Sequence, residues 1–309
     1  MNALNTESPV PVDAPPEQNP VRAVLWMVAS GLCFVGVTAG VKYLGPGIPA
    51  PQSAFLRYAL GLVYVLPVLG LLRRTRLEPK VWRAFAWRGV AHTLAVMLWF
   101  YAMTRIPLAE VSAMGYMNPI WISIGAALFL GERLRLRRIV AIGVAIAGAL
   151  VILRPGLREL NSGHLAMLGT SLFFAFSYLT AKRLSGRVSP VVIVTLLSLS
   201  VTIGLAPFAL AVWAPVTWVQ IATLFGIATF ATAGHYMMTY AFAAAPITVT
   251  QPVTALQLVW SVALGAAFFG EPVDLWVIVG GTMVVSAVIF IALREQQLRR
   301  AAKGGTLSA

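Results

Sequence analysis

Long apolar segments follow one another along nearly the whole chain, separated by short clusters of charged residues, glycine and proline. A helix that crosses the hydrocarbon core of a membrane needs about 20 mainly apolar residues. Dividing the chain at the polar clusters gives ten candidate segments, at 23–44, 53–72, 82–104, 107–130, 139–153, 163–184, 190–213, 218–245, 247–269 and 275–293. The pattern predicts an all-α integral membrane protein with ten transmembrane helices.

The second half of the chain repeats the first. A shift of 139 residues superimposes identical residues, among them Tyr101 on Tyr240, Trp121 on Trp260 and Gly131-Glu132 on Gly270-Glu271. Nearer the N-terminus the best shift is 140 residues, which places Phe34 on Phe174. Each copy holds five predicted helices, an odd number, so the second copy crosses the membrane in the opposite direction. Such inverted repeats allow a site at the membrane midplane to open to either side in turn.

The two copies define the expected domain organisation. The first repeat spans 23–156 and the second spans 163–293. The segment 1–22 is rich in proline and has no long apolar run, so we expect a disordered cytoplasmic tail rather than a signal peptide. We expect a second, similar cytoplasmic tail at 294–309.

The lysines and arginines lie mostly on one side of the predicted topology. With a cytoplasmic N-terminus, the inner loops and nearby helix ends hold most of the 23 basic residues, including four arginines between positions 133 and 138. This bias predicts that both termini are cytoplasmic. We also expect the protein to lie in the inner membrane. The net charge of +13 is then a topology signal and not a nucleic-acid-binding surface.

The composition agrees with a membrane environment and supplies little for enzymatic chemistry. Hydrophobic residues make up 59% of the chain, charged residues 11%, and the mean hydropathy is +0.83. The sequence contains no phosphate-binding loop, so we expect a secondary transporter rather than an ATPase. Three histidines, His92, His164 and His235, stand at unrelated positions, and Cys33 is the single cysteine. We therefore expect no catalytic residue, no metal site and no cofactor.

Several motifs resemble the EamA domain of the drug/metabolite transporter (DMT) superfamily, present twice. They are the block 99–110, Asn118-Pro119 ahead of Leu130-Gly131-Glu132, and the segment 147–152. The resemblance covers about 23–293 and implies the ten-helix fold and transport of a metabolite. Within the family, Arg88-Gly89 and Phe55-Leu56-Arg57 are more similar to the branch with riboflavin and S-adenosylmethionine uptake carriers than to aromatic amino acid exporters.

Polar side chains recur along one face of the ninth predicted helix. They are Thr250, Thr254, Gln257 and Ser261, at spacings of about one helical turn. In the first repeat, Asn118 occupies the position equivalent to Gln257. The stripe and Asn118 either line a substrate cavity, where amides both donate to and accept from a ligand, or form hydrogen bonds between helices.

The third predicted helix stacks Arg88, His92 and Trp99 on one face. A cation, a titratable ring and an indole on one wall suit a flat conjugated or zwitterionic solute. Three alternatives stay open: Arg88 extends to the cytoplasmic surface, His92 is a hydrogen-bonded core residue, and Trp99 belongs to an interfacial belt.

Arg57 and Glu110 lie at similar predicted depth near the outer ends of the second and fourth helices. We expect them to pair or to gate the outer mouth, with a purely structural ion pair as the alternative. No carboxylate is predicted at the membrane midplane, so coupling to protons through Asp or Glu is poorly supported. Three other ways to drive transport stay open: exchange of solutes, facilitated diffusion, and coupling to protons through His92 or His235.

Together these patterns predict a secondary transporter that moves a small metabolite by alternating access. The resemblance suggests a flat aromatic or nucleoside-type solute such as riboflavin or S-adenosylmethionine. Two alternatives are an exporter of amino acids, amines or drugs, and a membrane scaffold or receptor whose polar stripes only hold helices together. The expected partners are the solute and the lipid bilayer, and a homodimer is no better supported than a monomer.

Overall fold

The computed structural model describes residues 19–68, 70, 77–118, 120–121, 124–125, 136–154, 160–184, 188–245, 250, 253–254 and 256–305, and every regular element among them is a helix. The first half contains α1 (Pro20–Leu44), α2 (Ala50–Gly61), α4 (Pro79–Met103), α5 (Leu108–Gly115) and α7 (Leu136–Leu153). The second half contains α8 (Ser162–Leu184), α9 (Pro190–Ala211), α10 (Trp218–Ala244), α12 (Leu256–Phe269) and α13 (Leu275–Gly305). Short 3-10 turns at Gly45–Gly47, Leu62–Tyr64 and Leu66–Val68 follow α1 and α2.

Local sequence signals explain where several helices begin. The Asn19 side chain accepts a hydrogen bond from the Arg22 amide at 3.0 Å, and proline occupies the first position of α1. Ser189 caps α9 in the same way, ahead of Pro190. Thr217 begins α10 with a reciprocal capping box. Such caps satisfy backbone amides that have no partner within the first turn.

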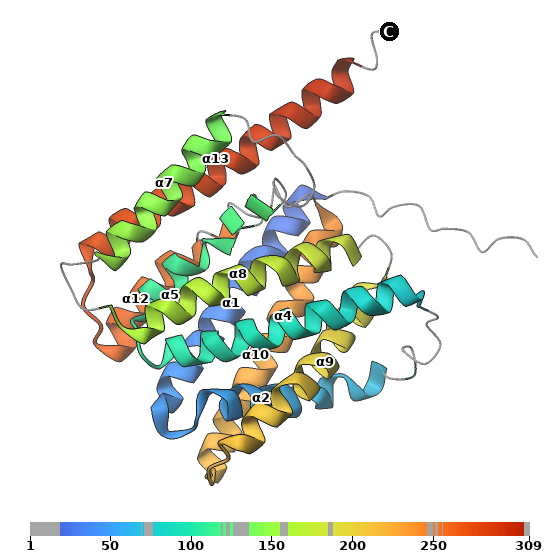
Figure 1. Cartoon of the computed structure of the whole chain (residues 1–309), viewed down its shortest axis with the longest axis vertical. Coiled ribbons are helices and arrows are strands. Elements are labelled where there is room, and N and C mark those ends of the chain that lie inside the picture. The colour runs from blue at the N-terminus through green and yellow to red at the C-terminus, as the bar shows by residue number, and fades with distance from the viewer. Residues whose placement is uncertain are drawn as a thin grey trace, which may run out of the picture.

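The helices of the two halves pack in matched pairs (Figure 1). Sequence position makes α1, α2, α4, α5 and α7 the counterparts of α8, α9, α10, α12 and α13. The contact between α1 and α10 has its equivalent in the contact between α8 and α4, and α4–α9 has its equivalent in α10–α2. The counterparts α2–α9, α5–α12 and α7–α13 pack directly on one another. The helix packing therefore reproduces the repeat that the sequence contains.

Four described helical stretches are long and apolar enough to cross a membrane: Val21–Gly47, Ser162–Ala181, Pro190–Ala211 and Trp218–Ala244. Shorter apolar helical stretches lie at Ile139–Leu153, Leu256–Phe269 and Leu275–Ile291. Large apolar side chains point outward from these helices, with 73% of Ile203 and 68% of Leu210 exposed. The protein is therefore an all-helical membrane protein, while the number of ten transmembrane helices stays a prediction.

Three element bounds differ from the predicted segments. Within the described residues, the second segment, predicted at 53–72, is an α-helix over Ala50–Gly61 and continues in 3-10 turns as far as Val68, since Pro67 cannot extend an α-helix. Helix α13 runs past 293 to Gly305, because the residues that follow are strong helix formers. Helix α1 begins at Pro20, inside the tail predicted at 1–22. Residues 1–18, Pro119, Gly131-Glu132 and Pro246 lie outside the described part of the chain.

Glycine allows α7 and α13 to approach closely. A Cβ atom on Gly148 would lie 2.6 Å from the Gly280 carbonyl oxygen, and a Cβ on Gly280 would lie 2.5 Å from the Gly148 carbonyl oxygen. Neither backbone oxygen can move aside as a flexible side chain would. These two helices therefore depend on small residues at their crossing, as is common between membrane helices.

We expect Gly148→Ala to destabilise the protein by about 1–3 kcal/mol, because the added methyl group forces the two helices apart. Gly143→Ala on the same helix is the matched control, since no atom lies within 4 Å of the point that its Cβ would occupy. That substitution should be neutral or slightly stabilising. Denaturant unfolding of both variants in detergent measures the difference, and equal stability would contradict the close crossing.

Candidate functional site

Buried polar and aromatic side chains from both halves meet around His92. We call this set the His92 cluster: Arg57 and Tyr58 on α2, Arg88, His92 and Trp99 on α4, Phe34 on α1, Phe174, Ser177 and Tyr178 on α8, and His235 on α10. His92 and Ser177 are fully buried, and Arg57, Tyr58, Arg88 and His235 are nearly so. The cluster contains all three residues that the sequence placed on one face of the third helix.

Both ring nitrogens of His92 have hydroxyl partners. Nδ1 lies 2.9 Å from the Ser177 Oγ, and Nε2 lies 2.9 Å from the Tyr58 hydroxyl. Each hydroxyl can donate or accept, so the arrangement suits either ring tautomer. These bonds tie α4 to α8 of the other half and to α2 of its own half.

Aromatic rings surround this hydrogen-bonded centre. Phe174 and Tyr178 stack with centroids 5.4 Å apart and an interplanar angle of 6°. The ring centroids of His92 and His235 are 5.6 Å apart, so two histidines that seemed unrelated in sequence share one site. The centroid of Trp99 lies 5.9 Å from that of Phe174. Such surfaces can take up a planar solute by stacking.

The repeat-equivalent residues Phe34 and Phe174 each contact a histidine of the other half. Phe34 lies edge-on to His235, with centroids 5.1 Å apart, and Phe174 lies 5.0 Å from His92. Trp99 contacts both phenylalanines, because its centroid is also 6.5 Å from that of Phe34. The cluster therefore lies where the two repeats meet.

Two buried guanidinium groups belong to the cluster. The Arg57 Cζ lies 3.9 Å from the centroid of the Tyr58 ring. Arg88 Nη1 donates to the Ile193 carbonyl oxygen of α9 at 3.2 Å, so Arg88 points into the bundle rather than to the cytoplasmic surface. The Nε atom of each arginine is buried and has no hydrogen-bond partner in the described part of the chain.

The predicted pairing of Arg57 with Glu110 was wrong among the described residues. Glu110 Oε2 lies 2.6 Å from Nε2 of His164 on α8, and both side chains are almost fully buried. Arg57 instead stacks on Tyr58. The pairing failed because it depends on which helices pack together, which the depth of each residue does not determine. A gating role for either residue stays a prediction.

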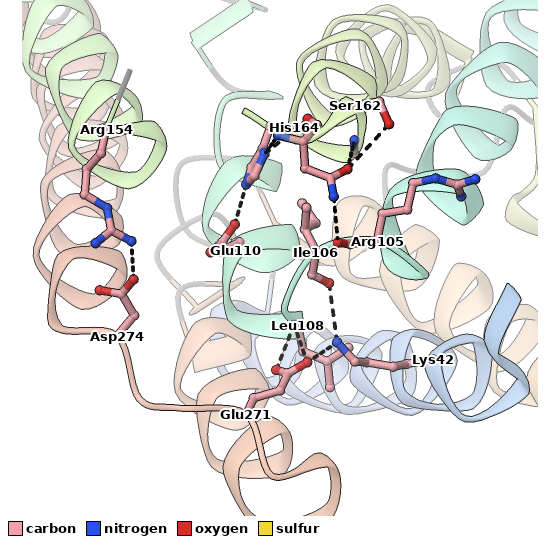
Figure 2. Close-up of polar contacts among 12 residues, drawn as sticks. Lys42, Arg105, Ile106, Leu108, Glu110, Arg154, Ser162, His164, Glu271 and Asp274 are labelled. Carbon is pink, nitrogen blue, oxygen red and sulfur yellow. Dashed lines mark hydrogen bonds and ion pairs between the residues drawn. The ribbon is translucent and has the colours of Figure 1, made fainter. Parts of the chain in front are cut away.

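The pair Glu110–His164 is one of three pairs of acidic and basic side chains that join the two halves, shown in Figure 2. We call them the inter-repeat ion pairs: Lys42–Glu271, Glu110–His164 and Arg154–Asp274. The Glu271 carboxylate also accepts the backbone N–H of Leu108, the first residue of α5, at 3.0 Å. In each pair one residue comes from the first repeat and the other from the second, so the three pairs connect the two repeats.

Two residues of the predicted stripe, Ser261 and Thr254, contact α5 and its C-cap residue Tyr116. Ser261 Oγ lies 2.5 Å from Ser112 Oγ, and the Tyr116 hydroxyl donates to the Thr254 carbonyl oxygen. Thr250 is fully buried and Gln257 half-buried. The contacts of Ser261 agree with hydrogen bonding between helices.

The buried Asn118 Oδ1 has no hydrogen-bond partner in the described part of the chain. An unpaired buried amide oxygen is free to accept from a ligand. Substrate binding by Asn118 and by the stripe nevertheless stays a prediction.

Sequence reasoning did not select Tyr58, Phe174, Ser177 or Tyr178 as site residues. The available signal was the match of Phe34 with Phe174 under the 140-residue shift, together with hydroxyl groups inside apolar segments. Buried hydroxyls of this kind require partners, and the hydroxyls of Tyr58 and Ser177 partner His92.

Two relatives of known activity match nearly the whole chain. A riboflavin transporter of Rhizobium johnstonii is 30% identical over 288 residues, which are 91% of this chain and 95% of that protein. A pseudopaline exporter of Pseudomonas aeruginosa is 28% identical over 277 residues, 87% of this chain and 95% of that protein. A solved crystal structure shares the fold, with a TM-score of 0.59 and 19% identity, covering 86% of this chain and 96% of that chain.

The EamA-like transporter family matches the chain twice, at residues 21–154 and 161–293. The two matches correspond to the two halves that pack in matched pairs. They confirm the resemblance in the sequence motifs, and the chain belongs to the EamA-like transporter family.

Proposed function

We propose that the protein is a secondary transporter of the inner membrane that works by alternating access, with two inverted five-helix repeats and both termini in the cytoplasm. Family membership supports transport. The matched helix pairs support a pseudo-two-fold relation between the halves. The bias of basic residues supports the orientation. In this orientation α1 and α7 run from the cytoplasmic side to the outer side. Lys42 lies in the last turn of α1 and Arg154 follows the last residue of α7, so the inter-repeat ion pairs close the outer end.

The observation that carries this proposal is the position of the His92 cluster between the repeats. Its polar groups come from α2 and α4 of the first half and from α8 and α10 of the second. When two repeats rock against each other, a site at their junction faces one side of the membrane and then the other. Solute binds against the rings of the cluster, and outward opening requires the inter-repeat ion pairs to separate.

The first candidate solute is a flat conjugated metabolite such as riboflavin. The stacked pair Phe174–Tyr178 and the indole of Trp99 offer planar surfaces, and His92 offers hydrogen bonds. Similarity to a riboflavin transporter supports the same class of solute. Similarity to a pseudopaline exporter supports export as the alternative direction.

Riboflavin counterflow in proteoliposomes tests this function. Vesicles loaded with unlabelled riboflavin should accumulate labelled riboflavin, and Trp99→Ala should weaken the apparent affinity about tenfold, because stacking on one aromatic side chain contributes roughly 1–3 kcal/mol. Trp218→Ala is the control, since Trp218 is 84% exposed at the start of α10.

An equal loss of apparent affinity in Trp99→Ala and Trp218→Ala would mean that the loss does not arise from stacking in the His92 cluster. Absence of riboflavin counterflow in the unaltered protein would contradict riboflavin as solute. The direction of transport is measured in vesicles of known protein orientation, because an exporter releases solute on the outer side of the protein.

A further inference from the structure

We infer that the His92 cluster binds a solute with an anionic group, a carboxylate or a phosphate, more tightly than the uncharged solute with the same ring, because Arg57 and Arg88 bind that group beside the aromatic rings. This inference rests on the proposed function, because it assumes that the His92 cluster is the substrate site. It adds a charge preference that neither the family nor the aromatic surfaces imply. Three observations carry it.

The first observation is burial without a counter-charge. Arg57 is 5% exposed and Arg88 2% exposed. Among the described residues their polar contacts are Tyr58 and a carbonyl oxygen of α9, and neither is a carboxylate. Buried charges in proteins are ordinarily paired, since burial removes the water that would otherwise stabilise them.

The second observation is that three described acids have basic partners elsewhere in the structure. Glu110, Glu271 and Asp274 all belong to the inter-repeat ion pairs at one end of the bundle (Figure 2). Glu78 is exposed at the start of α4. Within the described part of the chain, none of these four carboxylates contacts Arg57 or Arg88.

The third observation is the geometry of the unpaired donors. The Nε atoms of Arg57 and Arg88 are buried and unpaired within the described chain. Arg88 and His92 are four residues apart on α4, and Arg57 stacks on Tyr58, whose hydroxyl contacts His92. A guanidinium group presents parallel N–H donors that fit a carboxylate or a phosphate. A solute whose ring stacks in the cluster would therefore place its anionic group on these donors.

Two pairs of compounds test the inference, because the members of each pair share a ring and differ in charge. Flavin mononucleotide carries a phosphate that riboflavin lacks, and indole-3-propionate is an anion where tryptamine is a cation. Thermal unfolding of the purified protein measures binding without requiring transport. We expect the anionic member of each pair to bind about tenfold tighter, as charge-assisted hydrogen bonds are stronger than neutral ones.

Variants assign this preference to the two arginines. Arg88→Gln and Arg57→Gln should each abolish most of the preference, while Arg88→Lys should keep part of it because it keeps the charge. Arg105→Gln is the matched control, because Arg105 also stacks on a tyrosine, Tyr101, with its Cζ 3.5 Å from the ring centroid, yet lies exposed outside the cluster. If Arg88→Gln does not fold, Arg57→Gln carries the test.

The outcomes separate the inference from the proposed function. Anion preference that depends on either arginine supports the inference, even where riboflavin counterflow is absent and riboflavin is not the transported solute. Riboflavin counterflow without anion preference overturns the inference but still supports the proposal that the protein is a transporter. Preference that persists in both glutamine variants, or no stabilisation by any of the four compounds, also overturns it. A response to only one pair distinguishes a phosphate site from a carboxylate site.

Discussion

His92→Phe should lower the rate of riboflavin counterflow by at least about tenfold, with a loss of folding stability of roughly 1–3 kcal/mol for each hydroxyl left unpaired. The substitution keeps a ring of similar size among Phe174, Tyr178 and His235. It removes both hydrogen bonds of the imidazole, to Ser177 and to Tyr58, which join three helices from both halves. Counterflow in proteoliposomes and unfolding in detergent measure the two effects separately.

His235→Phe is the contrast for this experiment. His235 contacts Phe34 and His92 through its ring, and that ring makes no hydrogen bond within the described part of the chain. Phenylalanine preserves these ring contacts, so the loss of transport should be clearly smaller than in His92→Phe. Equal losses would mean that the hydrogen bonds of His92 are not what organises the site.

The double substitution Glu110→Gln with Glu271→Gln should open the outer end of the bundle. It neutralises two of the three inter-repeat ion pairs, one of them almost fully buried, and weakens the bond from Glu271 to the Leu108 amide. The first substitution leaves the buried His164 Nε2 without its carboxylate partner, at a cost of about 1–3 kcal/mol, and the second leaves Lys42 without its counter-charge. We expect the closed state to become less populated and the cluster to become more accessible from outside.

Labelling of a single cysteine in the cluster measures this change. Ser177→Cys provides the target, after Cys33→Ala removes the only native cysteine. The double variant should react faster with a membrane-impermeant thiol reagent added outside. Glu78→Gln is the control, because it removes the same charge from an exposed position at the start of α4. An unchanged labelling rate in the double variant would show that these pairs do not hold the outer end closed.

The sequence predicted those parts of the fold that local patterns encode. The segments predicted at 163–184 and 218–245 are the helices Ser162–Leu184 and Trp218–Ala244, because apolar runs and polar boundaries mark both ends. The segment predicted at 53–72 is apolar along its length, but its α-helix ends at Gly61 and 3-10 turns follow, because Pro67 cannot continue an α-helix. Apolar runs report the lipid environment well, but they do not report where an α-helix changes to 3-10 turns.

The candidate site was predictable only along a single helix. Helical spacing placed Arg88, His92 and Trp99 on one wall, and all three lie in the His92 cluster. The partners Tyr58 and Ser177 are 34 and 85 residues away in sequence, on helices that meet α4 only after the halves pack. The same reason explains why Glu110 pairs with His164 rather than with Arg57.

The most direct test of the account is the accessibility of Ser177→Cys from each side of the membrane, with and without riboflavin, in the protein that lacks Cys33. The account predicts slow labelling from either side and protection by riboflavin on both, because one buried site faces each side in turn. Labelling from one side only, or from neither under any condition, would contradict alternating access at the His92 cluster.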